Sequence, residues 1–539
     1  MMKALESPWL GERVLCHDQL LVVDKLAHVP VHGGTVAAAS VVERLKEHLR
    51  RAGQPAHLGV HQRLDQETSG VLLFTCAREL DASVGRAFEH HELERVYVAV
   101  VEGAIADQGV FENRLSPQQG GRVHVVNSGG KVARTAFRVL ERSGSRAMLE
   151  LRPTTGRTHQ LRVQLSHAGA PIVGDRLYGG ATAPRLMLHA LRLELLGRRF
   201  DAPLPTAFAA ALAGTAPTLD PADVRRVLRD AIQLRHVLAG RNTAFRLVNG
   251  WGDEMPGVEV DYFEGHVVLA LSSDAAESLR STLVHSLAEE GATSVYVKCR
   301  RRADQRTVDL AEVAPAVPDA GAAAPEPLWV SEGDLRLPVW LADGLSTGLF
   351  LDQRDNRAHL RQGVQGLSVL NLFCYTGSFS AAAARGEAAR VTSVDLSGRA
   401  LDRARQSVEN NGGTPRGEFR KGDAFEFIRR AVQHRERFDV VVLDPPSFGS
   451  RGRRRTFNVA SSYEELAAGC FRLLAPGGRL LAVTNHRKTS QGQLRRTLHR
   501  AAEQAERRIV QMKDAGARVD FPDGPSGPDP SKSVWIRVE

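Results

Sequence analysis

From about residue 341 to its end, the chain alternates between short apolar runs and amphipathic stretches, and this alternation constrains the fold more than any other feature. The runs LSVLNLF, VTSVDLS, FDVVVLDPPSF and GGRLLAVTN have the apolar, β-branched composition of buried strands. Small-residue or amphipathic segments such as FSAAAARG and LDRARQSVENN separate them. Strands that alternate with helices predict a parallel sheet with helical crossovers, so we expect an α/β domain over residues 341–539.

The chain in front of this domain has a different pattern. Residues 242–273 alternate apolar and polar side chains around Gly-Asp turns, which predicts strands and hairpins within a small α+β domain over residues 241–340. Residues 206–240 are rich in Ala, Pro and Thr, which predicts a linker that ends in a short helix. Residues 1–205 then form a first domain, and the whole is a multidomain α+β and α/β protein.

Composition agrees with several folded domains. A length of 539 residues predicts three to four domains at about 150 residues each. The net charge of +9 is compatible with a nucleic-acid partner, although basicity alone favours it only slightly. Five Cys without paired spacing argue against a disulfide framework or a zinc site, so we expect no metal. No apolar run has the length of a signal peptide or a membrane span, from which we expect a cytoplasmic protein that does not bind membranes.

The most specific motif of the first domain is GVHQRLDQETSGVLL at 59–73. The segments ERVYVAVVEG, TTGRTHQLRVQLSHAGAPIVGDRLYGG and RLMLHALRLEL follow it in order. These four segments resemble the RluA-type pseudouridine synthases, and the resemblance implies that family's mixed-sheet fold. The family usually has His-Arg-Leu-Asp in its catalytic loop, whereas this chain inserts Gln62 and keeps the spacing of Arg63 and Asp65.

The resemblance also implies a reaction and its catalytic residues. Uridine becomes pseudouridine when the bond from ribose C1′ to uracil N1 breaks and the base rejoins through C5, without any cofactor. Asp65 is implied as the carboxylate that attacks C1′ or removes the C2′ proton. It must stay ionised in a pocket that excludes water, which a neighbouring guanidinium favours. That partner is implied at Arg162, and Arg157 is the less favoured choice. Arg63 of the same loop is implied as a further catalytic residue.

Two further side chains complete this expectation. Tyr97 is implied to stack on the uracil and to assist removal of the C5 proton, and Arg157 is expected to contact the substrate. The target uridine must leave its stack, so the substrate is structured RNA. Without the neighbouring motifs, Asp65 would be interpreted as a turn residue and Tyr97 as a core residue of a strand.

The C-terminal domain carries a second constellation. A Gly-containing turn after its first strand, at Gly377, and an acidic residue that closes the second strand, Asp395, are a common arrangement for holding an adenosine. NAD enzymes share this layout. The motif LDPPSF at 443–448 distinguishes this chain from NAD enzymes. A strand that ends in Asp-Pro-Pro before an aromatic residue resembles the acceptor site of nucleic-acid base methyltransferases.

FRLVNGWGDEMPGVEVD and STGLFLDQRDNR extend the resemblance to the large-subunit rRNA methyltransferases of RlmI and RlmK type, over about residues 241–539. The resemblance implies a Rossmann-like methyltransferase with a mostly parallel sheet and S-adenosylmethionine as cofactor. The implied cofactor-binding residues are Phe350, Arg354, Phe373, Gly377, Asp395, Asp423 and Asp444. The implied substrate-binding residues are Pro445, Pro446, Phe448 and Asn485, with Phe448 placed to stack on an extruded base.

The residue at position 485, an Asn, indicates which atom of the base is methylated. Carbon 5 of cytosine reacts only after a thiolate adds at C6, so cytosine methylation needs a Cys in the pocket. The cytosine branch of the resemblance has that Cys where this chain has Asn485, and AVTNHRK looks closer to the branch that methylates guanine N7. That ring nitrogen already carries a lone pair and mainly needs positioning. We expect guanine N7, with another ring or exocyclic nitrogen as second choice.

Together these features predict a bifunctional RNA-modifying enzyme. 23S rRNA is the favoured substrate, and tRNA is the second. Two alternatives remain open. One is an RNA-binding ribosome-assembly factor with one inactive half, and the other is a cytosine methyltransferase that draws its thiol from Cys374.

Overall fold

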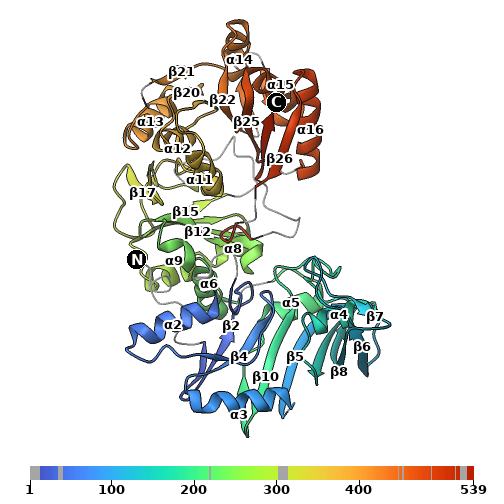
Figure 1. Cartoon of the computed structure of the whole chain (residues 1–539). Helices are drawn as coiled ribbons and strands as arrows, with labels where there is room; N and C mark the ends of the chain where they lie inside the picture. Colours follow the sequence, from blue (N-terminus) through green and yellow to red (C-terminus); the bar gives the residue numbers. More distant parts are fainter. Residues whose placement is uncertain are drawn as a thin grey trace.

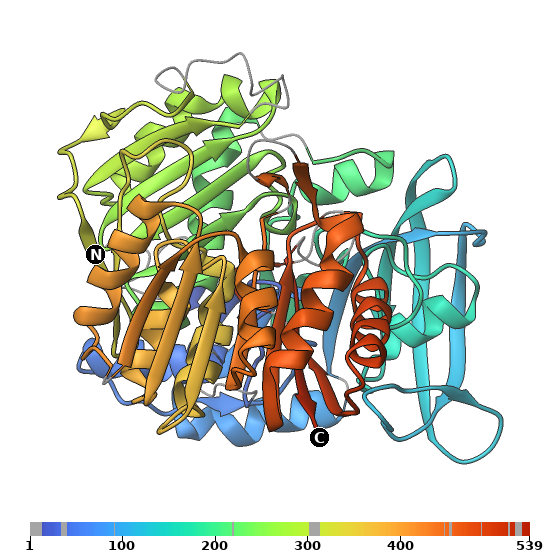
Figure 2. The same ribbon diagram turned by 90° about the horizontal axis from the view of Figure 1, so that it is seen from above.

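The computed structural model describes residues 13–33, 40–90, 92–217, 220–300, 313–414, 416–446, 448–451, 455–486, 488–515, 518–522 and 531–539, without the side chains of 448–451 and 455–461. An eleven-stranded, a five-stranded and a seven-stranded sheet follow one another along the chain. They lie at the bottom, middle and top of the molecule in Figure 1. The strands of one arm of the N-terminal sheet, β6, β7 and β8, project to the right both in that view and from above in Figure 2.

The N-terminal sheet is mixed. Its order is β1-β2-β4-β10-β5-β9-β8-β6-β7, with β3 paired to β4 and β11 to β10. The strands are β1 (Val14–His17), β2 (Leu20–Lys25), β3 (Gly59–Val60), β4 (Ser69–Thr75), β5 (Leu93–Glu102), β6 (Gln108–Leu115), β7 (Val125–Val126), β8 (Lys131–Ser143), β9 (Arg146–Pro153), β10 (Leu188–Leu195) and β11 (Arg198–Asp201). Strands β4 and β10 pair in parallel, while β10 and β5 pair antiparallel. The predicted mixed-sheet fold is confirmed.

Among the described residues, the helices that pack on this sheet are α2 (Val41–Arg51), α3 (Arg78–Glu89), α4 (Gln160–His167) and α5 (Ala207–Ala213). Helix α5 lies in the segment predicted as a linker, yet its Phe208 is fully buried in the core of the N-terminal sheet. Helices α6 (Pro221–Leu234) and α7 (His236–Ala239) follow. Asp220 caps α6 by accepting from the amide of Ala222 at 2.9 Å, and α6 packs on the next sheet. The predicted linker therefore contains packed helices, and the bounds of the four predicted segments stay our proposal.

The middle of the chain forms a small α+β unit. Its strands are β12 (Ala244–Asn249), β13 (Val258–Phe263), β14 (His266–Leu271), β15 (Ser294–Cys299) and β16 (Ala320–Gly321), in that order across the sheet. Helices α8 (Asp274–Ser278) and α9 (Arg280–Glu289) precede β15, and the hairpin of β17 (Leu328–Glu332) and β18 (Leu335–Val339) follows. The short helix η2 (Gly250–Asp253) joins β12 to β13.

The C-terminal sheet has the order β21-β20-β19-β22-β25-β27-β26. Its strands are β19 (Ser368–Leu372), β20 (Arg390–Asp395), β21 (Arg416–Lys421), β22 (Phe438–Leu443), β25 (Leu474–Thr484), β26 (Ile509–Asp514) and β27 (Lys532–Val538). The pairings from β21 to β25 are parallel, and β27 is antiparallel to both neighbours. This order confirms the predicted Rossmann-like, mostly parallel sheet.

Helices connect these strands: η3 (Leu351–Gln353), α11 (Arg354–Gln362), α12 (Ser378–Arg385), α13 (Gly398–Glu409), α14 (Ala424–Gln433), α15 (Val459–Leu473) and α16 (Gln491–Gln504). The strand predicted at 438–448 ends at Leu443, because Pro445 and Pro446 have no amide to continue the pairing. A hairpin of β23 (Phe448–Arg451) and β24 (Arg455–Asn458) follows the two prolines.

Candidate catalytic and cofactor sites

The first candidate site is built on the loop between β3 and β4. Asp65 lies in this loop, and the amide of Thr68 donates to its carbonyl oxygen at 3.1 Å. Lys25, fully buried at the end of β2, donates from Nζ to the carbonyl oxygen of Gln66 at 3.1 Å. Burial lowers the pKa of Lys25 to about 7. The loop that presents Asp65 is therefore supported from inside the protein.

The inserted residue is accommodated ahead of Asp65. Gln62 donates from Nε2 to the carbonyl oxygen of Val71 at 3.4 Å, which places its side chain along β4. Arg63 is exposed and lines the cavity in front of the loop. The insertion therefore leaves Asp65 facing the cavity.

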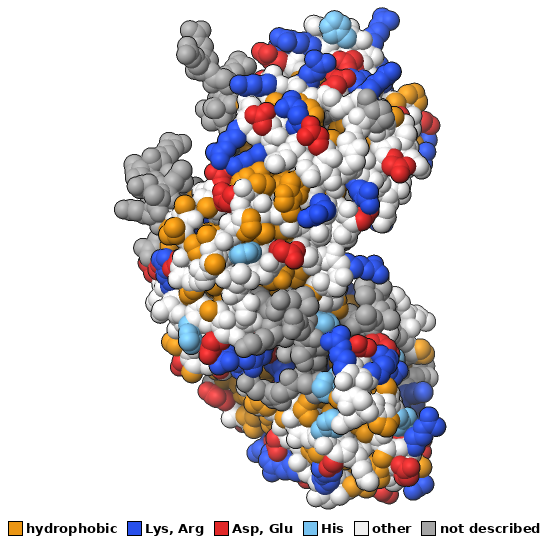
Figure 3. Space-filling view, turned by 90° about the vertical axis from the view of Figure 1, so that its left-hand side faces the viewer, with side chains coloured by type: hydrophobic (Ala, Val, Ile, Leu, Met, Phe, Trp, Pro, Cys, Tyr) orange, Lys and Arg blue, Asp and Glu red, His pale blue; other side chains and the backbone are white. Residues whose placement is uncertain are grey.

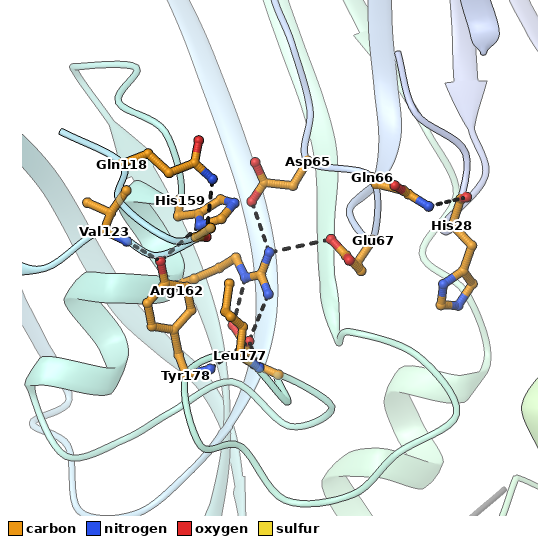
Figure 4. A network of polar contacts seen from close by, with 12 residues as sticks. His28, Asp65, Gln66, Glu67, Gln118, Val123, His159, Arg162, Leu177 and Tyr178 are labelled. Atoms are coloured by element: carbon orange, nitrogen blue, oxygen red, sulfur yellow. Dashed lines mark hydrogen bonds and ion pairs between the residues drawn. The ribbon is translucent and has the colours of Figure 1, made fainter. Parts of the chain in front are cut away.

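Asp65 meets the guanidinium that the sequence predicted. Nη1 of Arg162, from α4, lies 3.4 Å from Oδ2 of Asp65 and also 3.4 Å from Oε2 of Glu67 (Figure 4). The side chain of Asp65 is 24% exposed and that of Arg162 only 5%. The geometry confirms the predicted contact and adds Glu67, which the sequence analysis did not single out.

Arg162 is itself fixed by Asp175. Nε and Nη2 of Arg162 donate to the two oxygens of this fully buried carboxylate at 2.7 and 2.8 Å. The guanidinium also lies over the ring of Tyr178, 5.4 Å from its centroid. Burial opposes the charge of Arg162, but its bonds with Asp175 and the fields of Asp65 and Glu67 outweigh burial and raise its pKa. A permanent positive charge therefore faces Asp65.

Asp175 and Tyr178 both lie in the segment GDRLYGG, which the family resemblance includes, but that segment does not show what they contact. The hydroxyl of Tyr178 accepts from the amide of Val123 at 3.0 Å and lies 2.8 Å from Nδ1 of His159 (Figure 4). These bonds join the arm of β6 to β8 to the helix that carries Arg162.

Tyr97 reaches the same cavity from β5. Burial raises the pKa of its phenol. The charge of Arg95 lowers this pKa, and the charge of Asp65 raises it further. The phenol is therefore neutral near pH 7, which suits stacking on a base but makes it a weak proton acceptor. Of the two predicted roles of Tyr97, stacking agrees better with this environment.

These side chains line one cavity of about 1020 Å³. Its wall includes all five predicted residues of the N-terminal half: Arg63, Asp65, Tyr97, Arg157 and Arg162. Arg157 is exposed at the wall and donates from Nε to the carbonyl oxygen of Val132 at 3.1 Å. Since a volume of roughly 300–1,000 Å³ holds a drug-sized ligand, this cavity has room for more than one base.

A second cavity, of about 270 Å³, lies at the carboxyl ends of β19, β20 and β22. This is where open α/β sheets bind their ligands. Its lining includes the predicted residues Phe350, Phe373, Asp395, Asp423, Asp444, Pro445, Pro446 and Asn485. Gln353, Arg357, Asn371, Tyr375 and Phe425 also line it and were not singled out from the sequence.

Asp395 organises the floor of this cavity. Oδ2 accepts from the amide of Tyr375 and Oδ1 from the amide of Ser397, both at 2.9 Å. Phe373 and Tyr375 have left-handed backbones, with φ of 57° and 49°, so this turn is strained and held in place. A carboxylate oxygen has two lone pairs, so each oxygen of Asp395 can accept one further hydrogen bond, as from a ribose hydroxyl.

Asp423 and Asp444 differ in their surroundings. Asp423 caps α14 by accepting from the amides of Phe425 and Glu426 at 2.9 and 3.2 Å. Burial raises the pKa of Asp444 to about 7, and Asp352 adds to this while Arg357 opposes it. Asp444 is therefore a carboxyl group that changes charge near neutral pH.

Two predicted cofactor residues do not line the cavity. Arg354 forms a buried pair with Asp520, at 2.7 and 2.9 Å, so its side chain turns away from the ligand space. Gly377 starts α12 with φ of 77°, and a Cβ there would lie 2.6 Å from Cβ of Ala404. Its lack of a side chain permits close packing of α12 on α13. The side chain of Phe448 lies outside the described residues.

The cavity's wall suits S-adenosylmethionine. The free lone pairs of Asp395 fit ribose hydroxyls, the rings of Phe350 and Phe425 offer apolar surface for an adenine, and Asp444 can face a cationic group. Among the described residues, no group of three or more His, Cys, Asp and Glu side chains could hold a metal ion. In the same part of the chain, no helix is both long and apolar enough to span a membrane.

Comparison with known proteins agrees with two catalytic halves. A family model described as RNA pseudouridylate synthase matches residues 19–167, and a model described as S-adenosylmethionine-dependent methyltransferase matches residues 303–524. Ribosomal RNA large subunit methyltransferase I of Erwinia tasmaniensis is 34% identical over 306 residues, which cover 56% of this chain and 75% of that protein. The protein of the same name from Photobacterium profundum is 32% identical over 305 residues, with coverage of 55% and 74%.

A solved structure shows the same likeness. SMU.776, crystallised with SAH, matches 59% of this chain and 82% of its own with a TM-score of 0.53 at 27% identity. SAH is what remains of S-adenosylmethionine after its methyl group has left.

Proposed function

The chain belongs to the family of ribosomal RNA large subunit methyltransferase I and carries an RNA pseudouridylate synthase domain in front of that part, and from this premise we propose that it modifies large-subunit ribosomal RNA twice. One half isomerises uridine to pseudouridine, and the other methylates a base with S-adenosylmethionine. The observation that carries the proposal is the contact of Asp65 with the buried Arg162 in a cavity large enough for nucleotides.

In the synthase half, Asp65 is the proposed catalytic carboxylate. Its contact with Arg162 at 3.4 Å favours the ionised form, which either attacks C1′ or takes the C2′ proton. Tyr97 then provides a neutral ring against the extruded uracil, and Arg63 and Arg157 at the cavity wall are placed to contact phosphates. No cofactor takes part in this isomerisation.

In the methyltransferase half, the bound cofactor supplies an electrophilic methyl group on a sulfonium. Asp395 and Asp423 are the residues that we propose to hold its adenosine, and Phe350 and Phe373 cover the same space. Pro445, Pro446 and Asn485 line the cavity beside Asp444, and we propose that they orient the acceptor base. Holding the acceptor atom in line with the methyl group is then the main task of the protein.

Guanine N7 is the acceptor that we propose. Asn485 stands where a cytosine methyltransferase would need its thiol, and the two cysteines of this domain are poor substitutes. Cys374 lies in the cavity wall and Cys470 in α15, and burial raises the pKa of both thiols. Neither supplies a thiolate near pH 7.

We therefore expect Cys374→Ala to keep methyl transfer within about twofold of the original chain, because an un-ionised thiol is not a nucleophile. Transfer of tritiated methyl from S-adenosylmethionine to 23S rRNA measures this. The same assay on Asn485→Ala is the comparison, since this variant removes a proposed acceptor contact. If Cys374→Ala abolishes transfer and Asn485→Ala does not, cytosine is the acceptor and the N7 proposal is wrong.

The pKa of Asp444 predicts how cofactor affinity depends on pH. A pKa of about 7 leaves Asp444 mostly neutral at pH 6 and mostly ionised at pH 8, and the ionised form attracts a cation. We expect the affinity for S-adenosylmethionine to rise by up to about tenfold over this interval and to be flat in Asp444→Asn. Isothermal titration measures both, and SAH, which lacks the sulfonium charge, serves as control. An equally steep rise in Asp444→Asn would assign the effect to another group.

The proposed function is tested by mass-spectrometric mapping of 23S rRNA from cells with and without the gene. Loss of one pseudouridine and one methylated guanine is the expected result. Loss of neither mark, with tight binding of the purified chain to the RNA, would instead favour an assembly factor.

A further inference from the structure

A third cavity lies where the N-terminal sheet meets the middle of the chain. Its volume is about 300 Å³. Side chains of both halves line it. The synthase half contributes Arg13, Asp24, Ser69 and Arg185, helix α6 contributes Asp230, and Glu254 follows directly after η2. Neither proposed reaction uses this cavity, so its charged wall calls for another explanation.

Arg185 connects the two sides. Its side chain is 9% exposed, it donates from Nη2 to Oγ of Ser69, and its Nη1 lies 3.8 Å from Oε1 of Glu254. Oγ of Ser69 also lies 2.7 Å from Nδ1 of His189. Ser69 begins β4 at the end of the loop that carries Asp65. Arg185 therefore joins the end of the catalytic loop to a residue of the methyltransferase half.

Glu254 is held firmly in place. Its backbone is left-handed, with φ of 61°, a conformation that a non-glycine residue keeps only when its surroundings impose it. The preceding Asp253 pairs with the fully buried Arg235 through two bonds of 2.6 Å and also accepts from the amide of Asn249 at 2.6 Å. The carboxylate of Glu254 thus faces Arg185 from a backbone that the contacts of Asp253 hold in place.

We propose that Glu254 is a positioning residue for pseudouridine formation, which it supports by keeping Arg185 on Ser69. This inference rests on the proposed synthase function. Removing the carboxylate partner of a buried arginine leaves an uncompensated charge, and Asp24 is another carboxylate whose charge acts on Arg185. Oδ1 of Asp24, in the wall of the same cavity, is buried and has no hydrogen-bond partner among the residues that the structure describes. Movement of Arg185 toward Asp24 releases Ser69 and, with it, the end of the Asp65 loop.

The test compares Glu254→Gln with a matched control. We expect Glu254→Gln to lower kcat for pseudouridine formation by about tenfold, because a small shift of a catalytic group is costly, with the KM for RNA and methyl transfer nearly unchanged. Asp223→Asn removes a carboxylate from the wall of the same cavity, but Asp223 pairs with Arg226 of its own helix at 3.3 Å. This variant should behave like the original chain.

A double-mutant cycle separates positioning from a general loss of structure. If Glu254 acts through Ser69, adding Glu254→Gln to Ser69→Ala costs nothing further. Additive losses, or an unchanged kcat in Glu254→Gln, overturn the inference. Glu254→Asp, which keeps the charge, replaces Glu254→Gln in the cycle if the latter unfolds at the assay temperature. Activity in Asp65→Asn would refute the synthase function itself, whereas an inactive Asp65→Asn beside a normal Glu254→Gln refutes only the role of Glu254.

Discussion

Asp65→Asn is expected to lower pseudouridine formation at least about a thousandfold, since the amide neither attacks C1′ nor accepts a proton. The replacement is isosteric and its site is 24% exposed, so the fold should persist. Release of tritium from RNA labelled at uracil C5 measures the reaction. Methyl transfer by the same preparation should be unchanged, because Asp65 lines a different cavity from Asp395 and Asp444.

Glu67→Gln provides the matched comparison. Glu67 and Asp65 lie at the same distance from Nη1 of Arg162, so contact with the guanidinium does not by itself tell which carboxylate reacts. Glu67 is more exposed, at 45%. We expect Glu67→Gln to keep activity within about tenfold. The assignment of Asp65 is wrong if Glu67→Gln is inactive and Asp65→Asn is not.

The surroundings of Arg162 explain why one guanidinium can contact two carboxylates, those of Asp65 and Glu67. Its Nε and Nη2 are occupied by Asp175, which leaves Nη1 directed at the loop. A buried Arg and Asp with two bonds between them have little freedom to move. Asp175 therefore orients the guanidinium of Arg162, and this orientation directs Nη1 toward Asp65. The sequence segment GDRLYGG contains this residue, but neither its composition nor its spacing shows which arginine it pairs with.

Much of the fold could be predicted because buried strands have a distinctive composition. The predicted runs at 367–373, 391–397 and 477–485 correspond to β19, β20 and β25, with ends that differ by a few residues. The alternation of these strands with helices leaves few possible arrangements. The contact of Asp65 with Arg162 is different, since the two residues are far apart in the chain. The family resemblance supplied it, and no local pattern could.

Two of the predicted cofactor-binding residues, Arg354 and Gly377, do not line the cavity. Arg354 starts α11 directly after Gln353, which does line the cofactor cavity. Its partner Asp520 lies 166 positions away in sequence, so the pair is visible only after folding. Gly377 follows the first strand as a ligand-binding glycine would, yet the atom nearest to a Cβ there belongs to Ala404. A glycine motif indicates that another group lies close to the backbone, but it does not tell whether that group is a ligand or a side chain of the protein.

The composition of the predicted linker did not reveal that one of its helices is buried. AFAAALA of α5 is nearly uniform, and alanine gives little contrast between a buried and an exposed face. Phe208 nevertheless packs among Val98, Leu149 and Leu188 of the N-terminal sheet. Helix α6 has the contrast that α5 lacks, and it packs on the middle sheet through Val224, Leu228 and Ile232. The chain between the two halves is therefore part of both cores and connects them through packed helices.

The distribution of basic side chains can be followed on one face of the molecule (Figure 3). On the face in Figure 3, Lys and Arg are scattered among acidic side chains over both ends of the molecule. Many arginines of the N-terminal sheet are paired, as Arg138 is with Glu150 at 2.8 Å. The net charge of +9 thus does little to locate the RNA. Arg162, whose Nη1 meets Asp65 at the cavity, together with Arg63 and Arg157 in the cavity wall, is the more specific indication.

Asp395→Asn is expected to weaken binding of S-adenosylmethionine by about ten- to a hundredfold. Each oxygen of Asp395 accepts one backbone amide, from Tyr375 and Ser397, and has capacity left for a ribose hydroxyl. A hydrogen bond to a charged group is worth about 1.5–3 kcal/mol, and 1.4 kcal/mol corresponds to tenfold in affinity. Isothermal titration with S-adenosylmethionine measures the loss, and pseudouridine formation should be unaffected.

The same substitution has a second effect that separates ligand binding from turn geometry. The amide group of Asn presents an N–H to one of the two backbone donors, so that donor loses its acceptor at a cost of about 1–3 kcal/mol to the fold. Asp402→Asn, on the exposed face of α13 where Asp402 pairs with Arg405 at 3.3 Å, removes a nearby charge without touching the turn and should change neither quantity. If Asp395→Asn lowers the free energy of unfolding but leaves the affinity intact, Asp395 shapes the turn around Phe373 and Tyr375 and does not itself hold the ribose.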